Sequence, residues 1–237
     1  MNRIALMVLR NIPIVPGAWF KLCHYAKNTD KYSEEEKYAH IRYILQCGVR
    51  GGNINLHIYG EENIPDGAAL LYSNHQGLFD VVAAVVACEK PISAVFKKEL
   101  ENLPLIKQIA VCLKGLPMDR NDARQSLGVI QTVTEEVLKG RKYIIYPEGT
   151  RSKLGNKMLD FHAGSFRCAV KAKCPIVPVA VIDTYKVFDT KNSKPVDCQL
   201  RFLTPIQPEE YEGMKAGEVA DLVKGRIQEA LDQYAEV

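Results

Sequence analysis

A histidine and an aspartate that follow an apolar run are the residues best suited to acid–base chemistry. Residues 70–73 lead directly into Asn74 and His75, and Asp80 lies five positions after the histidine. A carboxylate that accepts a hydrogen bond from one imidazole nitrogen leaves the other nitrogen free to act as a base. Gly77 permits a tight turn, and Asn74 can brace that turn or cap a following helix. The pattern indicates a His–Asp dyad, and a surface histidine beside a helix cap would have the same spacing.

A second apolar run, residues 143–146, precedes a segment suited to binding an anion. It continues through Glu148, Gly149, Thr150 and Arg151. Glycine lets the backbone approach a ligand closely, and a guanidinium presents a planar set of donors that fits a phosphate. The segment therefore favours an anion site, whereas a salt bridge between Glu148 and Arg151 would account for both side chains without a ligand.

Three more basic residues follow other apolar runs. Lys97 and Lys98 come after residues 92–96, and Arg120 comes after residues 116–119. Any one of them alone is typical of a solvated surface charge. Because functional groups collect beyond the carboxyl ends of the strands in an α/β sheet, we expect these cations near the dyad.

The elements that must position these residues alternate along the chain. Hydrophobic patterns predict strands at residues 53–59, 68–73, 92–96, 116–119, 142–146, 175–182 and 198–203. They predict helices at residues 78–89, 104–113, 121–139, 162–173 and 216–235. This alternation predicts an α/β fold in which helices flank a mostly parallel or mixed sheet of about seven strands, preceded by an N-terminal helical pair.

The composition excludes several classes of protein. The chain has 237 residues, of which 47% are hydrophobic and 25% charged, which is typical of a globular protein and not of a disordered chain or a coiled coil. Seven cysteines, an odd number without a C-x-x-C pair, argue against a disulfide framework or a zinc cluster and for a reducing compartment. We expect no metal site and no nucleic-acid partner.

Positive charge and apolar bulk coincide at the N-terminus. Residues 1–27 contain four bases and no acid: Arg3, Arg10, Lys21 and Lys27. Their apolar stretches are too short to span a bilayer, which takes roughly 20 residues. We expect residues 1–50 to form an amphipathic region that binds an anionic membrane surface, and residues 51–237 to form the α/β domain. Packing of the first helix on the protein's own core is the alternative.

Taken together, the motifs resemble those of the glycerophospholipid acyltransferase family, in particular its bacterial 1-acyl-glycerol-3-phosphate branch. Four blocks occur in the family's order between residues 53 and 205. They are Asn74, His75 and Asp80; residues 115–120, ending in Arg120; residues 148–152; and residues 176–180, around Pro178. The first and third blocks are the specific ones.

Some positions depart from the family pattern. Gly77 stands where many relatives carry serine, so a hydroxyl role is absent there. Pro117 and Met118 replace aromatic or aliphatic residues in the second block, and His162 stands near a position that is often lysine. We assign His162 no role.

The resemblance implies transfer of an acyl group from acyl-CoA or acyl carrier protein to the 2-hydroxyl of lysophosphatidic acid, without a cofactor or metal. His75, oriented by Asp80, would remove the hydroxyl proton and then protonate the leaving thiolate. Backbone N–H groups at residues 77–79 would stabilise the oxyanion. The enzyme would lie peripherally on the cytoplasmic face of the cell membrane.

The remaining motif residues would bind the substrate or support the site. Those expected to hold the phosphate and glycerol are Arg120, Glu148, Gly149, Thr150, Arg151, Lys97 and Lys98. Those expected to give structural support are Asn74, Gly77 and Pro178.

Other functions share these features. The acceptor can instead be glycerol-3-phosphate or a lysophospholipid with a larger headgroup. A thioesterase would use the same base and admit water. A non-catalytic lipid-binding protein would retain the basic, apolar N-terminus.

Overall fold

The computed structural model describes residues 2–190 and 192–235, in which seven strands form one sheet. The strands are β1 (Ile54–Tyr59), β2 (Ala69–Ser73), β3 (Ser93–Lys97), β4 (Leu116–Met118), β5 (Lys142–Ile145), β6 (Ile176–Ile182) and β7 (Val196–Phe202). Their order across the sheet is β1-β7-β6-β2-β5-β3-β4. The predicted α/β fold is confirmed, and every strand begins and ends within two residues of its predicted range.

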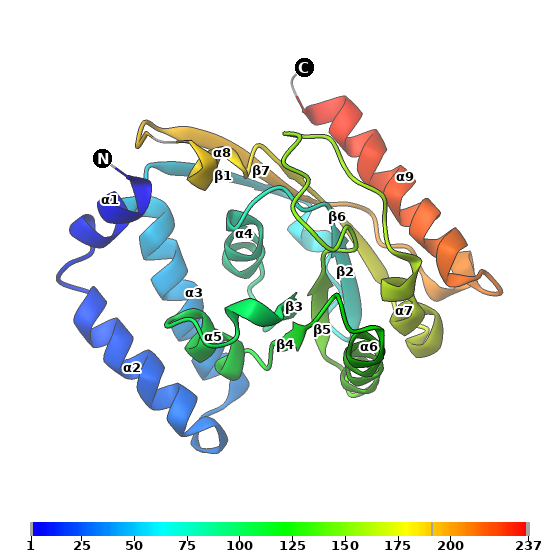
Figure 1. Cartoon of the computed structure of the whole chain (residues 1–237), viewed down its shortest axis with the longest axis horizontal. Coiled ribbons are helices and arrows are strands. Elements are labelled where there is room, and N and C mark those ends of the chain that lie inside the picture. Colours follow the sequence, from blue (N-terminus) through cyan, green and yellow to red (C-terminus); the bar gives the residue numbers. More distant parts are fainter. Residues whose placement is uncertain (1, 191, 236–237) are drawn as a thin grey trace.

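Helices cover both faces of this sheet (Figure 1). The α-helices are α1 (Arg3–Arg10), α2 (Val15–Lys27), α3 (Glu34–Gly51), α4 (Phe79–Ala87), α5 (Ile106–Cys112), α6 (Ala123–Leu138), α7 (Arg167–Ala172), α8 (Lys186–Asp189) and α9 (Ala216–Tyr234). Short 3₁₀ turns lie at Thr29–Lys31, Glu61–Asn63, Lys98–Leu100, Ala163–Phe166 and Pro208–Tyr211. One apolar core joins α2, α3 and α4 to the sheet, and another joins α6, α7 and α9 to its opposite face.

The direction of the strands explains where the motif residues meet. β6, β2, β5, β3 and β4 run parallel to one another, whereas β7 is antiparallel to β6 and carries β1 parallel to itself at the sheet edge. The carboxyl ends of the five parallel strands therefore lie along one edge. Because β2 lies between β6 and β5, the segments that follow these three strands are neighbours there.

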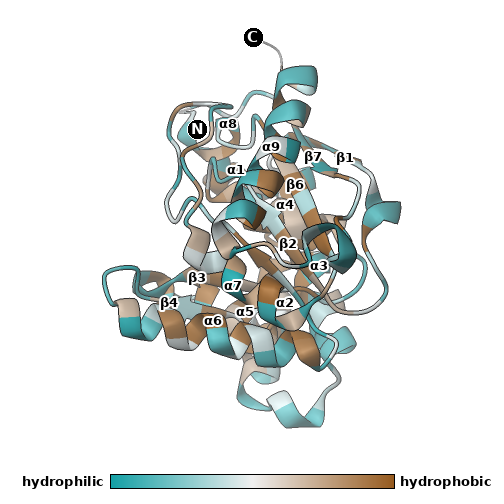
Figure 2. Cartoon of the chain, turned by 90° about the vertical axis from the view of Figure 1, so that its right-hand side faces the viewer, coloured by the Kyte–Doolittle hydropathy of each residue, from teal (hydrophilic) through white to brown (hydrophobic). Residues whose placement is uncertain are grey.

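The central strands of the sheet are buried on both faces. Every residue of β2, β5 and β6 is buried, as expected for parallel strands covered by helices on both faces. Figure 2 shows these strands as mainly hydrophobic ribbons between helices of mixed hydropathy. This burial explains why the strands are continuous apolar runs in the sequence, and it gives the loops at their ends a rigid base.

The N-terminal region contains three helices where a helical pair was expected. A turn at residues 11–14 that includes Pro13 separates α1 from α2, since proline removes a helical N–H donor. Ser33 then caps α3 by accepting a hydrogen bond from the N–H of Glu36 over 3.1 Å. α1 and α2 both pack against α3.

The first basic residue does not face solvent as the charge pattern suggested. Arg3 is 2% exposed, and its guanidinium donates to the backbone carbonyls of Val187 and Gly52, each over 2.7 Å. It therefore ties α1 to the rest of the molecule and is not available to a membrane surface. Among the described residues, no helix has the length and apolar character needed to cross a bilayer.

Candidate active site

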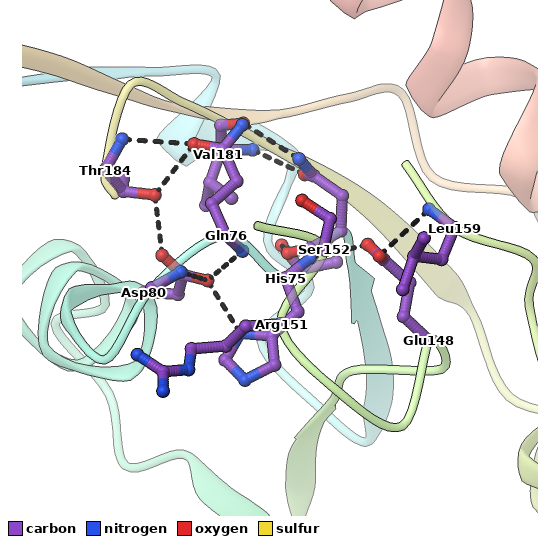
Figure 3. Close-up of polar contacts among 12 residues, drawn as sticks. His75, Gln76, Asp80, Glu148, Arg151, Ser152, Leu159, Val181 and Thr184 are labelled. Atoms are coloured by element: carbon purple, nitrogen blue, oxygen red, sulfur yellow. Dashed lines mark hydrogen bonds and ion pairs between the residues drawn. The ribbon is translucent and has the colours of Figure 1, made fainter. Parts of the chain in front are cut away.

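His75 and Asp80 meet at the carboxyl end of β2 (Figure 3). His75 Nδ1 lies 2.7 Å from Asp80 Oδ2, although the two residues are five positions apart. His75 stands in the turn before α4, whereas Asp80 lies in the first turn of that helix, so the imidazole can fold back over the helix start. Of the two arrangements that the spacing allowed, the His–Asp contact is the one found, and Asp80 engages Nδ1 and not Nε2.

The Asp80 carboxylate is fully buried and is held by several donors. Its exposed fraction is 0%, and its Oδ2 atom accepts from the N–H groups of Gln76 over 2.7 Å and Gly77 over 3.0 Å. Its Oδ1 atom accepts from the hydroxyl of Thr184 over 2.6 Å. A buried carboxylate is stable only when its oxygens are paired, so these donors fix Asp80 in one orientation.

The loop after β5 holds the backbone of His75 at both ends. The His75 N–H donates to Glu148 Oε1 over 2.7 Å, and the His75 carbonyl accepts from the N–H of Ser152 over 2.8 Å. The imidazole also packs on the ring of Tyr146, with centroids 4.5 Å apart. The first and third sequence motifs therefore form one structural unit around the imidazole.

Glu148 acts as a brace within this unit. Its Oε2 atom accepts from the N–H of Leu159 over 3.0 Å, so both carboxylate oxygens are engaged by backbone donors. The alternative salt bridge with Arg151 is not the arrangement found, because Arg151 pairs with Asp189 at 3.9 Å. Burial raises the pKa of the Glu148 carboxyl, and its two backbone hydrogen bonds only partly oppose that effect.

This raised pKa predicts a pH-dependent difference between the wild type and Glu148→Gln. The folded protein binds a proton at Glu148 more readily than the unfolded chain, whose pKa is about 4.3. The free energy of unfolding of the wild type should therefore rise relative to that of the variant as pH falls through the raised folded pKa, and the gain should be complete below the unfolded value. Urea unfolding of both proteins between pH 4 and pH 8 measures this difference; a constant or opposite difference would contradict the raised pKa.

Gly149 and Thr150 line a cavity of about 490 Å³ beside the brace. Gly149 has a φ of +69°, and a Cβ there would lie 3.0 Å from the ring of His162. Glycine is needed at this position for both reasons. Arg120, His162 and Arg167 also border the cavity, and its apolar wall consists of Val95, Met118, Leu127, Ile130, Ile145 and Tyr146. His162, to which we assigned no role, is thus next to the motif.

The predicted cations are distributed unevenly. Arg120 borders the cavity, whereas Figure 3 shows the guanidinium of Arg151 on the Asp80 side of the imidazole, away from Glu148. Lys97 pairs with Glu99 at 2.7 Å, and Lys98 pairs with Asp119 at 3.4 Å. The two lysines are therefore engaged by surface carboxylates in this structure.

The residues expected to give support lie at the β2–β6 junction. The side chain of Asn74 exchanges two hydrogen bonds with the backbone of Val181, at 2.8 and 2.9 Å, so it braces the turn and does not cap α4. A Cβ at Gly77 would lie 3.1 Å from Tyr185 Cα, so the glycine permits close approach of that segment. Pro178 lies within buried β6, opposite Tyr72 of β2.

Sequence reasoning missed three residues of the site. Thr184 and Gln76 share a buried polar network with Asp80, and Tyr146 supports the imidazole. Thr184 follows the end of β6, where the strand-end rule applies, but only the strand order shows that β6 adjoins β2. Tyr146 directly precedes the third motif and was counted only as part of an apolar run.

No metal centre accompanies the dyad in the described part of the chain. Groups of three or more His, Cys, Asp or Glu side chains placed to hold a metal ion are absent there. The prediction that the reaction uses no metal or cofactor is not tested by this finding.

Comparison with known proteins gives the family. The family model described as Acyltransferase matches residues 55–182, which include the dyad and the Glu148 segment. The chain belongs to this acyltransferase family. The sequence motifs that suggested the resemblance therefore coincide with the segment that establishes membership.

Curated relatives and a solved structure resemble this acyltransferase. A 1-acyl-sn-glycerol-3-phosphate acyltransferase from Helicobacter pylori is 31% identical over 66% of the chain, and one from Escherichia coli is 33% identical over 61%. These matches span 64% and 59% of the relatives' own lengths. The crystal structure of a 1-acyl-sn-glycerophosphate acyltransferase from Thermotoga maritima is 20% identical, with a TM-score of 0.78, over 98% of this chain and 97% of that chain. The structural likeness establishes the shared fold.

Proposed function

We propose that the chain transfers a fatty acyl group from an acyl thioester to the 2-hydroxyl of 1-acyl-glycerol-3-phosphate, giving phosphatidic acid. The observation that carries this proposal is the 2.7 Å contact between His75 Nδ1 and the buried Asp80 carboxylate, beside cationic groups at one sheet edge. Family membership and the names of the curated relatives support the acceptor.

In the proposed mechanism, His75 carries one proton from the acceptor hydroxyl to the leaving thiolate. The Nε2 atom takes the proton of the 2-hydroxyl as the oxygen attacks the thioester carbonyl. Asp80 stabilises the imidazolium that forms. When the tetrahedral intermediate collapses, the carbon–sulfur bond breaks and the imidazolium gives its proton to the departing thiolate. No acyl-enzyme forms, and the imidazole is neutral again at the end.

The start of α4 supplies the proposed oxyanion donors. The N–H of Gly77 already donates to Asp80, so this residue is not one of them. The N–H groups of Leu78 and Phe79, at the first turn of the helix, remain the candidates.

The cationic residues of the motifs are the proposed ligands of the substrate phosphate. Arg151 directly precedes Ser152, whose N–H donates to the His75 carbonyl, and Arg120 borders the cavity, so we propose both arginines as phosphate ligands. The N–H of Gly149 already donates to the carbonyl of Tyr146 over 3.1 Å, so Thr150 would provide the backbone donor of the residue 147–150 turn. The structure gives less support to Lys97 and Lys98, because each has a carboxylate partner.

A product analysis tests this function. Wild-type protein is supplied with acyl-CoA or acyl carrier protein and with lysophosphatidic acid, glycerol-3-phosphate or a choline lysophospholipid, and products are identified by mass. Phosphatidic acid as the main product supports the proposal, and the donor that gives it identifies the thioester. Preference for another acceptor, or quantitative release of free fatty acid, would overturn it in favour of a different acyltransferase or a thioesterase. No transfer, with vesicle binding intact, would favour a lipid-binding protein.

We also propose that residues 1–50 bind the cytoplasmic face of the membrane peripherally and that residues 51–237 form the catalytic domain. The supporting observation is an exposed apolar surface on α1, α2 and the turn between them, formed by Ile4, Val8, Leu9, Ile12, Val15 and Phe20. Phe20 is 73% exposed. Lys21 and Lys27 are exposed on α2, so basic and apolar groups are both available to an anionic bilayer.

Replacing two of these side chains should weaken vesicle binding. Leu9→Ser combined with Phe20→Ser should lower the partition coefficient at least about tenfold, because a fully buried large apolar side chain contributes roughly 1.5–3 kcal/mol. Sedimentation with anionic vesicles at low and high salt measures this effect, and raised salt should weaken wild-type binding. Deleting residues 1–27 would be a poorer test, because Leu22 and Tyr25 belong to the core.

A control variant places two serines on another surface. Leu127→Ser combined with Leu138→Ser alters two exposed leucines of α6 and should bind vesicles as the wild type does. Equal binding by both double variants would contradict the membrane surface proposed for α1 and α2.

A further inference from the structure

Three donors to the Asp80 carboxylate come from residues 75–77, and a fourth comes from the turn after β6. Thr184 Oγ1 donates to Asp80 Oδ1 over 2.6 Å, whereas the donors from the turn all use Oδ2. Thr184 is 1% exposed and stands two residues after the end of β6. The carboxylate is thus held from two directions, one oxygen by each side of the β2–β6 junction.

The single hydroxyl proton of Thr184 is donated to Asp80 and not to Gln76. Thr184 Oγ1 also lies 3.1 Å from Gln76 Oε1, but the contact with Asp80 is shorter and involves an ionised acceptor. Gln76 Oε1 already accepts from the N–H of Thr184 over 3.1 Å. Each polar atom of this buried group therefore has a partner when the hydroxyl points at Asp80.

The turn that carries Thr184 is itself fixed. Asp183 has a φ of +61°, a conformation that residues other than glycine seldom adopt. Asn156 holds it there: its Oδ1 atom accepts from the N–H of Asp183 over 2.9 Å, and its Nδ2 atom donates to Asp183 Oδ1 over 3.1 Å. Gln76 donates to the same Asn156 oxygen over 2.8 Å. The backbone at Thr184 is therefore locked to the His75 turn.

Gly77 allows this segment to approach. A Cβ at residue 77 would lie 3.1 Å from Tyr185 Cα and 3.5 Å from the carbonyl oxygen of Thr184. Both neighbours are backbone atoms, which do not move aside easily. Gly77 thus accompanies the close packing that brings Thr184 to Asp80.

From these contacts we infer that Thr184 is a positioning residue of the dyad: its hydroxyl holds the Asp80 carboxylate in the orientation that presents Oδ2 to His75 Nδ1. Thr184 acts through Asp80. It lies two residues beyond the segment that the family model matches. The kinetic part of the test rests on the proposed acyl transfer, and the spectroscopic part does not.

Two substitutions at Thr184 and one elsewhere test the inference by kinetics. Thr184→Val removes the hydroxyl at nearly constant shape and should lower kcat about 10- to 100-fold, part of the roughly 10²- to 10⁴-fold that a positioned acid–base group supplies, with KM little changed. Thr184→Ser keeps the hydroxyl and should retain most of kcat. Thr134→Val removes another buried hydroxyl, which donates to the Ile130 carbonyl within α6, and should leave kcat unchanged.

The variants are also compared by the ¹H resonance of the His75 Nδ1–H, assigned by its loss in His75→Ala. A proton in a short hydrogen bond to a carboxylate resonates far downfield. This resonance should move or broaden in Thr184→Val and persist in Thr184→Ser and Thr134→Val. In a His75→Ala background, Thr184→Val should cause no further loss of turnover, because it acts through the dyad.

The inference fails if Thr184→Val keeps the wild-type kcat, if Thr134→Val loses as much, or if the loss persists in full in the His75→Ala background. An unchanged resonance in Thr184→Val also overturns it. If the wild type transfers no acyl group to any acceptor, the proposed function fails by itself, and the resonance alone decides the role of Thr184.

Discussion

His75→Ala should lower kcat/KM for acyl transfer about 10²- to 10⁴-fold, the range that a positioned general base contributes. The change removes the ring whose Nδ1 atom contacts Asp80 and leaves the backbone hydrogen bonds of residue 75 to Glu148 and Ser152 in place. The variant should therefore fold and still bind the acceptor. Steady-state turnover, together with lysophosphatidic acid binding by calorimetry, measures both outcomes.

A second histidine provides the matched control. His57 is exposed on β1 and contacts Asp197 at 3.1 Å, which gives it a carboxylate partner far from the sheet edge where the parallel strands end. His57→Ala should keep wild-type turnover. If His75→Ala turned over at a rate close to that of His57→Ala, His75 would not be the base.

Asp80→Ala should cost both activity and stability. Two buried N–H groups, those of Gln76 and Gly77, would lose their acceptor, and an unpaired buried donor costs about 1–3 kcal/mol. We therefore expect the free energy of unfolding to fall by about 2–6 kcal/mol and turnover to fall about 10²- to 10⁴-fold. Urea unfolding and turnover assays measure the two effects.

Asp80→Asn separates the two effects. The amide oxygen can accept from the same N–H groups, while its NH₂ group can donate to Thr184 Oγ1, whose proton can turn to Gln76 Oε1. Most of the stability should remain, but the imidazolium would lose its counter-charge, so turnover should stay low. High turnover in Asp80→Asn would show that the carboxylate charge is not needed.

Local patterns in the sequence predicted most of the fold. The buried runs that became β2 and β5 are continuous and apolar because both faces of each strand are covered, and the turn residues after them mark where each strand ends. The contact between His75 and Asp80 is one of two interpretations that the spacing allows, and it could be considered because both residues belong to one strand–turn–helix unit.

Features that depend on distant contacts were not predictable from local patterns. The contact between Thr184 and Asp80 requires β6 to lie beside β2, which no pattern within either segment specifies. The pairing of Lys98 with Asp119 likewise depends on β3 lying next to β4. Arg3 carries the charge of a surface residue, and only the fold shows that carbonyls from distant segments surround it.

The burial of Arg3 limits how α1 can move. Its guanidinium donates to carbonyls of α8 and of the residues at the end of α3, and withdrawing it would leave several of these acceptors and the charge itself to be resolvated. Helix α1 therefore cannot bind the membrane while moving independently of the rest of the protein. Under the proposed membrane attachment, the whole enzyme would therefore keep one orientation relative to the bilayer surface. The height of the imidazole above the headgroups would then be constant, and it would decide which lipid hydroxyls come within reach.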